Sequence, residues 1–579
     1  MGLAIKIQNV RYKPARFIRQ SEHTESIKVI GIDTEAFTTG KCFMICTSYG
    51  DVFLPSQYPD CFFTRKYRGV NFVAYNLKYD SGALLQHLPL KHLQELQKHD
   101  ETEFNGYTYK VIANKLLSVR KGKNTFHIYD MLNFYNMSLD NASKEYLNKS
   151  KKEISTKNFT PEYLKAHYEE IAEYCIQDAV LVKELAELII QRFESFGVYP
   201  RKLYSVAYAS WQYFKNNCPW IHVKRYWYGK REVLNYAMQS YNGGKFEVTE
   251  KGTGYYYEYD IVSAYPNEIA NLIDIRKARI KHSRRYIKEA VYAFLKCKMQ
   301  IPFNVFSPIA VNDGKVNYYP IGIFEKVITL NEYKYLISQG VNIDILDGYW
   351  FLVDKIRYPY KTRIIELMEY KHKFKLEGNK VDYHTVKIFL NSFYGKLVQL
   401  IDKEEYLEAG SSWNPIFGSI ITANTRLRVT ELQQKYPSII AVHTDSVIST
   451  KPLPFQKTGE LGEMTYECEG NGVILGSGIY QIGTKSKLRG FESKTPLLEL
   501  LPRKGKYLKT NKVRPYTWRE IAHRSLDTAL INKFENIDRK LHINFDTKRI
   551  WLNDYADYKE VKQRNVESIP WDITIQLIR

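Results

Sequence analysis

Apolar and polar positions along the first third of the chain predict a small sheet covered by helices. Alternating apolar residues at 27–33 and an apolar run at 43–48 predict neighbouring strands. Residues 49–51 supply a turn into a third strand at 52–55. Over 161–196 the apolar residues recur at helical spacing, so this segment is expected to form helices that pack on the sheet.

The second half of the chain carries a similar pattern and predicts a second β-rich region. Residues 252–262 read as a buried strand, and 436–450 read as a hairpin with polar residues at its tip. Between them, 273–357 is mixed and 358–395 is strongly helical. Without internal repeats or low-complexity tracts, the pattern indicates an α/β (α+β) protein of several domains.

Charge and aromatic content favour nucleic acid as the partner class. The 579 residues include 84 Lys+Arg and 63 Asp+Glu, a formal net charge of +21, together with 47 tyrosines. A strong positive field attracts polyanions, and aromatic rings offer faces on which bases stack. The alternative is a basic protein whose charge is spread evenly for solubility. A hydrophobic content of 44% excludes a disordered chain.

Cysteine usage and hydropathy bear on the compartment. The seven cysteines are an odd number and lack the paired spacing of structural zinc sites, which favours a reducing compartment. No apolar stretch approaches the roughly 18 residues of a membrane span, and no signal-peptide core is visible. We therefore expect a soluble cytoplasmic protein with no membrane partner, in the host cytosol if a phage encodes it.

Acidic residues in the first third suggest a metal site. Asp33 and Glu35 follow a buried strand on one face, and Asp80 is expected at the end of another strand. Tyr174 and Asp178 are one helical turn apart. Four such acids could hold two hard cations about 3.5–4 Å apart, which is suited to phosphodiester hydrolysis. The alternative for the first pair alone is a solvated strand end.

A second set of polar residues lies in the latter half. Asp260 ends an apolar strand, and Asp445 lies at the tip of the predicted hairpin, so the two could meet across one sheet and hold a second metal pair. On a helix, Lys387, Asn391 and Tyr394 fall on one face. That face could meet a triphosphate and a base; the alternative is a solvated amphipathic surface.

The order of these motifs resembles the family B DNA polymerases. DxE, NxxxD and YxxxD between residues 33 and 178 are similar to the motifs of the 3′–5′ exonuclease domain. DxxSxYP from Asp260, KxxxNSxYG from Lys387 and TDS around Asp445 are similar to polymerase motifs A, B and C. The sequence at 241–244 resembles the YxGG motif, and the compact length is similar to the protein-primed, phi-29-type branch.

This resemblance implies an RNase H-like exonuclease domain followed by a right-hand polymerase domain with a terminal-protein-region insertion. The expected segments are 1–198, an N-terminal arm plus exonuclease domain; 199–272, the first part of the palm; 273–357, the terminal-protein-region 1 insertion; 358–396, the fingers; 397–416, a shortened terminal-protein-region 2; 417–515, the second part of the palm; and 516–579, the thumb.

The resemblance also implies residue roles. Expected catalytic residues are Asp260, Asp445, Lys387, Asp33, Glu35, Asp80, Tyr174, Asp178 and Lys157, the last chosen from Lys151, Lys152 and Lys157. Expected nucleotide contacts are Ile261, Tyr265, Asn391, Tyr394 and Gly395. Expected DNA contacts are Asn76, Tyr79, Tyr241, Gly243, Gly244, Ser263, Ser392, Thr444, Tyr480 and Lys487. Two Mg²⁺ ions in each site, replaceable by Mn²⁺, are expected on Asp33, Glu35 and Asp178 and on Asp260, Asp445 and the backbone of Ile261.

Four departures from the family pattern stand out. His443 replaces the first acid of motif C, Ala264 replaces a leucine of motif A, and Gly478 replaces the lysine of the KxY motif. The segment 397–416 is too short for the complete second insertion, which in this family closes a ring around DNA. Metal preference, a primer contact and processivity are therefore open.

The sequence thus predicts a DNA-directed DNA polymerase with a 3′–5′ proofreading exonuclease. Its expected partners are primer-template DNA, deoxynucleoside triphosphates and a terminal priming protein, and a monomer is expected. The alternatives are a catalytically silent DNA-binding protein and a nuclease whose second half only grips DNA.

Overall fold

The computed structural model describes residues 10–11, 25–219, 230–403, 406–491, 493, 495–502 and 504–576. Of the basic arm expected over 1–20, only strand β1 (Val10–Arg11) lies within these ranges. All seven cysteines are unpaired. Among the described helices, none combines the length and the apolar character that crossing a bilayer requires.

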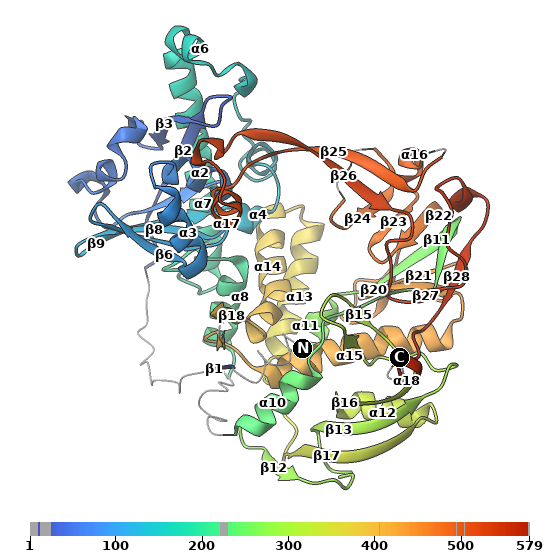
Figure 1. Cartoon of the computed structure of the whole chain (residues 1–579). Coiled ribbons are helices and arrows are strands. Elements are labelled where there is room, and N and C mark those ends of the chain that lie inside the picture. The colour runs from blue at the N-terminus through green and yellow to red at the C-terminus, as the bar shows by residue number, and fades with distance from the viewer. Residues whose placement is uncertain are drawn as a thin grey trace.

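The first third of the chain forms an eight-stranded mixed sheet, here called the N-terminal sheet (blue in Figure 1). Strands β2 and β5 and strands β5 and β9 pair in parallel, and the other neighbours pair antiparallel. The strands in spatial order are β4 (Val52–Phe53), β3 (Cys42–Thr47), β2 (Val29–Ala36), β5 (Asn71–Ala74), β9 (Asn124–Asp130), β8 (Leu116–Lys121), β7 (Tyr107–Ile112) and β6 (Glu101–Phe104). The predicted strands of this region are confirmed.

Helix α7 (Tyr168–Ser195) lies against strand β2 at a distance that requires glycine. A Cβ on Gly31 would lie 1.7 Å from the carbonyl oxygen of Ala179, so any other residue would push the helix away. This packing places Asp178 of the helix beside the acids of the strand. Further helices of this region are α2 (Leu77–Leu85), α3 (Leu90–His99), α4 (Leu132–Tyr135), α5 (Leu139–Ala142) and α6 (Pro161–Ala166).

The second half builds a nine-stranded sheet, here called the central sheet. The predicted strand at 252–262 and the predicted hairpin at 436–450 are confirmed and lie side by side in it. Its strands are β10 (Lys245–Val248), β20 (Ile439–Thr444), β21 (Ser446–Ser449), β11 (Glu250–Ile261), β22 (Met464–Gly476), β23 (Ile479–Ile482) and β24 (Lys485–Leu488), with β28 (Val566–Ile569) and β27 (Ile550–Trp551) joined to β11.

Three smaller sheets contain strands from residues 10–11, 279–352 and 400–409. The segment 273–357 contains a four-stranded antiparallel sheet, capped by α12 (Leu330–Ser338). Its strands are β12 (Arg279–His282), β17 (Asn342–Leu352), β13 (Tyr292–Ile301) and β16 (Gly322–Thr329). The same segment holds the hairpin of β14 (Val311–Asn312) and β15 (Asn317–Tyr318). The segment 397–416 reduces to β18 (Leu400–Lys403) and β19 (Tyr406–Ala409), which pairs with β1.

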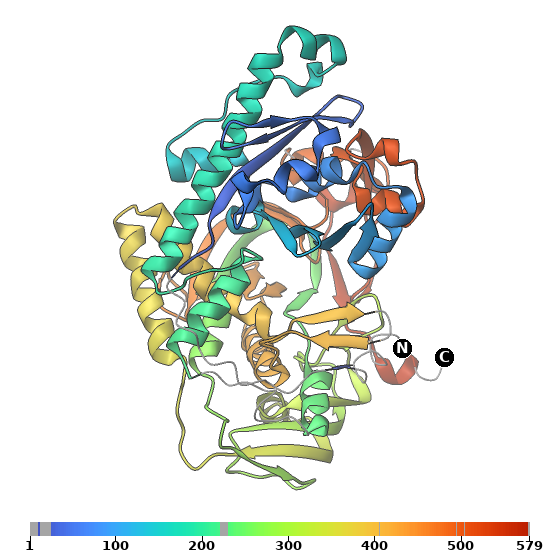
Figure 2. The same cartoon turned by 90° about the vertical axis from the view of Figure 1, so that its left-hand side faces the viewer.

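Helices join the sheets through one large hydrophobic core. Buried side chains of α7, α8 (Val206–Asn217), α14 (Lys380–Leu397) and α15 (Pro415–Lys435) share this core with Val29 and Val73 of the N-terminal sheet. The helices that follow α7 also include α10 (Arg231–Ser240), α11 (Ala264–Ala270) and α13 (Lys361–Leu376). In Figure 2 α7 runs beside the N-terminal sheet, and the green, yellow and orange helices lie between that sheet and the four-stranded sheet. The helices predicted over 161–196 and 358–395 are confirmed.

A two-stranded ribbon near the C-terminus spans from the central sheet to the N-terminal sheet (Figure 1). It consists of β25 (Tyr507–Pro515) and β26 (Phe534–His542), and we call it the C-terminal ribbon. The short helices α16 (Leu497–Leu500) and α17 (Trp518–Arg524) flank β25. The palm–thumb boundary that the sequence predicts between 515 and 516 falls inside this ribbon. The last described strand, β28, pairs with β11 of the central sheet.

Two candidate active sites

Four acids meet at the N-terminal sheet: Glu35, Asp80 and Asp178 are buried, and Asp33 is partly buried. Asp33 and Glu35 share one face of β2, and Asp178 reaches them from α7. Ligand atoms of Asp33, Glu35 and Cys175 all lie within 4.8 Å of one another. Asp80 accepts a hydrogen bond from Thr34 Oγ1 at 2.8 Å. The predicted early cluster is therefore brought together in space.

Asp80 reaches this cluster by a different route from the predicted one. It lies in helix α2, not at the end of a strand, because β5 ends at Ala74 and Asn76 turns the chain in a left-handed conformation with φ 67°. The Asn76 amide donates to Asp130 Oδ1 at 2.9 Å, as does the Leu132 amide at 3.0 Å. Sequence reasoning missed Asp130, whose buried carboxylate fixes the turn that delivers Asp80.

The electrostatics of this cluster fit a divalent cation. Burial raises the pKa of Glu35 to about 8 and that of Asp80 to about 7. Burial and then repulsion from Glu35 hold the pKa of Asp33 well above its usual range. Asp178 Oδ1 is buried and has no hydrogen-bond partner among the described residues. Clustered carboxylates with a free buried oxygen are the ligand set that Mg²⁺ or Mn²⁺ prefers.

A lysine and a tyrosine complete the edge of the cluster. Lys151 Nζ forms an ion pair with Asp178 and lies 4.6 Å from the ring centroid of the buried Tyr174. Lys157, the residue chosen from the sequence, is exposed in the short turn 156–158. The structure thus brings Lys151, not Lys157, to the acids. Tyr79, an expected DNA contact, lies near Glu35, and burial raises its pKa above the usual range.

Replacing Lys151 by alanine should slow degradation of single-stranded DNA by about 10- to 100-fold, because Lys151 orients and balances the Asp178 carboxylate. Lys157→Ala is the matched control and should leave the rate unchanged. The measurement is the initial rate of shortening of a labelled oligonucleotide. Equal losses of rate in the two variants, or a loss only in Lys157→Ala, would contradict the assignment of this role to Lys151.

The second cluster forms at the ends of interior strands of the central sheet. Asp260 is the last residue but one of β11 and lies opposite Ser446, while Asp445 lies in the tight turn between β20 and β21. The Ile261 amide donates to the backbone carbonyl of Asp445 at 3.0 Å, which fixes the two strand ends. Thr444 turns the chain with φ 64°. The predicted meeting of Asp260 and Asp445 is therefore observed.

This pair also fits a divalent cation. Burial, followed by the nearby Asp445, raises the pKa of Asp260 to about 7. Asp260 Oδ1 is buried without a hydrogen-bond partner among the described residues. The two acids line a cavity of about 500 Å³ whose wall also carries Lys485, Lys487 and Arg489. Carboxylates can hold a metal ion that binds phosphate, and the basic side chains can bind phosphate oxygens directly. The cavity therefore suits a phosphate chain.

The two departures His443 and Gly478 contact each other in this cavity. The Gly478 amide donates to His443 Nε2 at 3.2 Å, and the His443 ring stacks on Tyr480 with centroids 4.8 Å apart. Burial lowers the pKa of His443 to about 3, so the ring is neutral. A Cβ on Gly478 would lie 3.2 Å from the Arg489 side chain. Where the family pattern has an acid and a lysine, this chain therefore has an uncharged contact between His443 and Gly478.

Aromatic residues from three segments meet next to the pair of acids. The rings of Tyr265 and Tyr394 lie 4.5 Å apart, and Tyr241 Oη is 2.8 Å from Tyr394 Oη. Tyr480, another expected DNA contact, instead donates its hydroxyl to Glu258 at 2.9 Å. Gly395 is exposed, with open space where a Cβ would stand.

A lysine that the motifs did not reveal lies beside motif A. Lys371 Nζ of α13 donates to Ser263 Oγ at 3.2 Å, and Ser263 holds a left-handed turn. Lys387, Asn391 and Ser392 instead line a separate cavity of about 560 Å³ beside residues 133–137. Burial and then the neighbouring Lys387 lower the pKa of Lys371. The predicted face of α14 therefore forms, but it is not the wall of the cavity that contains Asp260.

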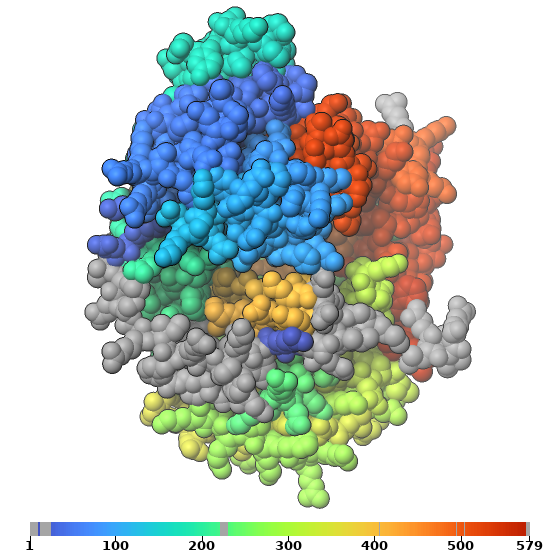
Figure 3. All heavy atoms as spheres, turned by 60° about the vertical axis from the view of Figure 1, so that its left-hand side comes forward, coloured from blue at the N-terminus to red at the C-terminus, as the bar shows by residue number. Residues whose placement is uncertain are grey.

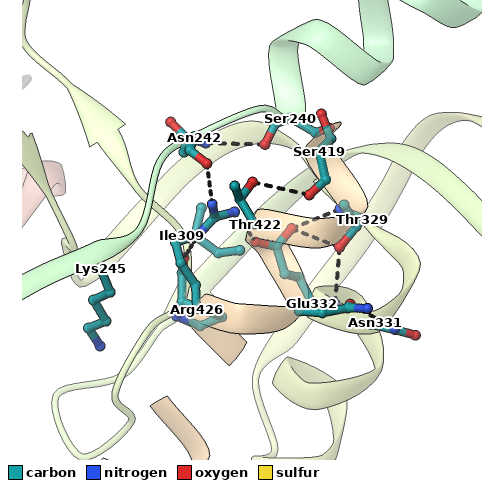
Figure 4. A network of polar contacts seen from close by, with 12 residues as sticks. Ser240, Asn242, Lys245, Ile309, Thr329, Asn331, Glu332, Ser419, Thr422 and Arg426 are labelled. Atoms are coloured by element: carbon teal, nitrogen blue, oxygen red, sulfur yellow. Dashed lines mark hydrogen bonds and ion pairs between the residues drawn. The ribbon is translucent and has the colours of Figure 1, made fainter. Parts of the chain in front are cut away.

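The loop at 241–244 is held by a buried arginine that sequence reasoning also missed (Figure 4). Arg426 Nη1 donates to the carbonyl oxygens of Asn242 at 2.6 Å and Gly243 at 3.0 Å. Its Nη2 forms an ion pair with Glu332 at 2.8 Å, and both side chains are almost fully buried. Gly244 is required next to it, because a Cβ there would lie 2.5 Å from Thr444 Cγ2.

Removing the partner of Arg426 should destabilise the protein. Glu332→Ala leaves a buried guanidinium without its carboxylate and should cost about 3–5 kcal/mol. Glu325→Ala, which breaks the exposed pair with Lys296, is the matched control and should cost less than about 1 kcal/mol. Calorimetric melting curves provide the comparison. Indistinguishable melting temperatures would show that the buried pair does not hold the loop.

Comparisons with known proteins identify the central part of the chain. Residues 151–412 match the family model described as DNA polymerase type B, organellar and viral. The match covers less than half of the chain, so it shows that this segment is similar to that family. The matched segment includes Asp260 and Lys387, while Asp33 and Asp445 lie outside it. The resemblance inferred from the motifs is confirmed.

A curated viral protein is also similar to part of this chain. A DNA polymerase of Acidianus bottle-shaped virus (isolate Italy/Pozzuoli) is 26% identical over 313 residues, which cover 47% of this chain and 43% of that protein. The alignment therefore spans less than half of the relative.

The predicted fold class is confirmed by solved structures. Phi29 DNA polymerase complexed with primer-template DNA and incoming nucleotides matches with a TM-score of 0.66 at 16% identity, over 90% of this chain and all of that chain. A binary complex with primer-template DNA matches with a TM-score of 0.64 at 15% identity, with the same coverage. At these identities the likeness shows the shared fold.

Proposed function

We propose that this chain is a DNA-directed DNA polymerase that also degrades DNA from the 3′ end. The observation that carries the proposal is the convergence of Asp260 and Asp445 on one cavity, with Lys485, Lys487 and Arg489 on its wall. The family match over 151–412 and the phi29-like fold support it.

In the polymerase reaction, the 3′-oxygen of a primer attacks the α-phosphorus of a deoxynucleoside triphosphate and pyrophosphate leaves. Asp260 and Asp445 would hold divalent ions, which supply charge neutralisation and activate the attacking oxygen. The basic wall would bind the triphosphate or primer phosphates, and Lys371 would hold Ser263 and the turn of motif A in place. Tyr265 and Tyr394 would pack against the sugar and base of the incoming nucleotide.

In the hydrolytic reaction, Asp33, Glu35, Asp80 and Asp178 would hold the ions and Tyr174 would orient the attacking water. Lys151 keeps the Asp178 carboxylate oriented. Because the two clusters lie on different sheets, we propose that synthesis and proofreading use separate sites.

The wider assignments rest on the resemblance. We propose that the N-terminal sheet is the exonuclease domain, the central sheet the palm, α13 and α14 the fingers, and the C-terminal ribbon the thumb. The four-stranded sheet would contact a terminal priming protein, which offers a hydroxyl in place of a primer end. The enzyme would act as a monomer on primer-template DNA.

Incubation of the purified chain with a primed template tests the proposal. With the four nucleotides and Mg²⁺ or Mn²⁺ we expect extended products, and without nucleotides we expect shortening of the primer. Degradation without extension with either metal would favour a nuclease. Absence of both would favour a silent DNA-binding protein, which the His443 and Gly478 replacements would then explain.

A further inference from the structure

Cys175 of helix α7 places a thiol among the acids of the early cluster. Its Sγ, one carboxylate oxygen of Asp33 and one of Glu35 all lie within 4.8 Å of one another. Cys175 is fully buried and unpaired. It is not among the metal ligands that the family resemblance implies, and the hydrolytic reaction proposed above gives it no part. The position of this thiol is therefore a property of this chain that the proposed reaction leaves unexplained.

The backbone fixes the thiol in this position. Gly31, Asp33 and Glu35 lie on one face of β2, because side chains two positions apart in a strand point the same way. Helix α7 packs on that face at the short distance that Gly31 permits. Cys175 and Asp178 are three positions apart in the helix, so they lie on the same side of it. The packed strand and helix therefore hold sulfur and oxygen ligands together.

Apolar side chains cover the thiol on its other side. Cys175 is buried in one core with Phe43, Met44 and Phe159. Side chains packed in such a core have few alternative rotamers, and the core excludes water from the space behind the sulfur. The thiol thus lies at the boundary between an apolar core and a set of carboxylates.

A further ligand atom is free at the same place. Asp178 Oδ1 is buried and has no hydrogen-bond partner among the described residues, while its Oδ2 pairs with Lys151. After burial, which is the main cause, the charge of Asp178 helps to raise the pKa of Asp33 and of Glu35, so it faces both. A buried carboxylate oxygen without a donor is costly unless a cation binds it.

Three carboxylates and one thiol suit a thiophilic cation better than Mg²⁺. Mg²⁺ requires near-octahedral oxygen ligands and keeps several waters, and sulfur is not one of its preferred donors. Zn²⁺ accepts cysteine sulfur together with carboxylate oxygen in a tetrahedral shell of four ligands. An ion held by four protein ligands has no open position for a water or a phosphate, as in closed structural zinc sites.

We propose that Asp33, Glu35, Cys175 and Asp178 form a Zn²⁺ site that stops degradation from the 3′ end and leaves DNA synthesis running. Zn²⁺ would compete for the carboxylates that hold the catalytic ions. Because the thiolate is the ligand, each ion bound releases the thiol proton to solvent. The effect on degradation rests on the proposed function, whereas binding of the ion does not.

The location of the four ligands confines the effect to one part of the molecule. All four belong to β2 or α7. In Figure 3 the N-terminal region forms the blue surface, above the green surface of the segment near residue 300. Asp260 and Asp445 lie instead at strands of the central sheet. An ion bound between β2 and α7 therefore leaves the cavity of the second cluster unoccupied.

Cobalt binding tests the site without any DNA. Co²⁺ accepts the same ligands as Zn²⁺, and its bond to a thiolate absorbs in the near ultraviolet. One equivalent of Co²⁺ added to the full chain should produce this band, and Zn²⁺ should remove it. Cys175→Ala should lack the band. Glu35→Gln, which leaves the cysteine in its core, should bind Co²⁺ at least about 10-fold more weakly.

Cys468→Ala is the matched control, because Cys468 is the one cysteine that is not fully buried and its Sγ lies 3.5 Å from Glu258. This variant should keep the band. Melting curves establish that each variant is folded. Absence of the band from the unaltered protein, or its persistence at full strength in both Cys175→Ala and Glu35→Gln, would overturn the site.

Rates measured with Mg²⁺ and a slight excess of Zn²⁺ over protein test the effect. Zn²⁺ should slow shortening of a labelled oligonucleotide at least about 10-fold and leave extension of a matched primer unchanged. Cys175→Ala should require at least about 10-fold more Zn²⁺ for the same fractional loss, each protein being compared with its own rate without Zn²⁺. Equal sensitivity of the two proteins, or equal loss of both activities, would overturn the proposal. Absence of degradation before Zn²⁺ is added would instead count against the proposed function.

Discussion

Asp445→Asn should lose template-directed nucleotide addition by at least about 10³-fold, while degradation of single-stranded DNA should continue at the original rate. The amide keeps the shape of the side chain but removes one of the two charges that meet at the cavity. A neutral oxygen binds Mg²⁺ or Mn²⁺ less strongly than a carboxylate does. Primer extension and oligonucleotide shortening, measured on the same preparation, give the two rates.

The same variant has a stability signature in EDTA. Asp260 has a pKa of about 7 in the folded protein, above its ordinary value, so the unfolded chain releases the proton first. The contribution of Asp260 to the stability of the unaltered protein therefore falls as pH rises from about 4 to 7. Asp445→Asn removes one cause of the raised pKa and should make that fall shallower. Asp354→Asn, at an exposed carboxylate, is the control for both assays. Parallel loss of extension and degradation would refute separate sites.

Asp33→Asn should produce the opposite pattern, with loss of 3′-end degradation by at least about 10³-fold and unchanged extension of a matched primer. Asp33 lies among the acids of the early cluster, and burial and then repulsion from Glu35 and Asp80 raise its pKa. Extension from a mismatched primer end should increase, because the mismatched nucleotide is no longer removed. The measurement compares matched and mismatched primers with and without nucleotides.

The control for Asp33→Asn is Asp60→Asn, in the same region but at a surface ion pair with Lys121. It should alter neither activity. Loss of extension in Asp33→Asn at unchanged melting temperature would mean that the two clusters act as one site.

Much of the fold could be predicted because the local apolar patterns matched the burial of each segment in the folded protein. Strand β2 and the hairpin of β20 and β21 are almost wholly buried, and their apolar runs show it. Asp80 was misplaced because an apolar run followed by an acid suits a strand end and a helix start equally well. Its true position depends on Asp130, which is 50 residues away along the chain and caps the turn at Asn76.

The candidate sites also contain some residues that the sequence indicated and others that only the packing revealed. The sequence indicated Asp33, Glu35, Asp260 and Asp445, since acids at the ends of apolar strands are unusual, and it indicated Asp178 by its helical spacing from Tyr174. Spacing could not choose between Lys151 and Lys157, because both lie in a polar segment. Only the packing of that segment beside α7 brings Lys151 to Asp178. Lys371 and Arg426 carry no sequence signal, because a lysine on a helix and an arginine in an apolar helix have many ordinary explanations.

By itself, the sequence determined the two β-rich regions, the helices between them and the acids that close each strand, because burial and periodicity act over a few residues. Tertiary structure alone decided which distant groups meet: the His443 and Gly478 contact, the Arg426 support of the 241–244 loop, and the packing of residues 516–533 on α2 and α3. These contacts join residues 35 to more than 400 positions apart, and their free energy comes from burial and charge pairing that exist only after the sheets have packed.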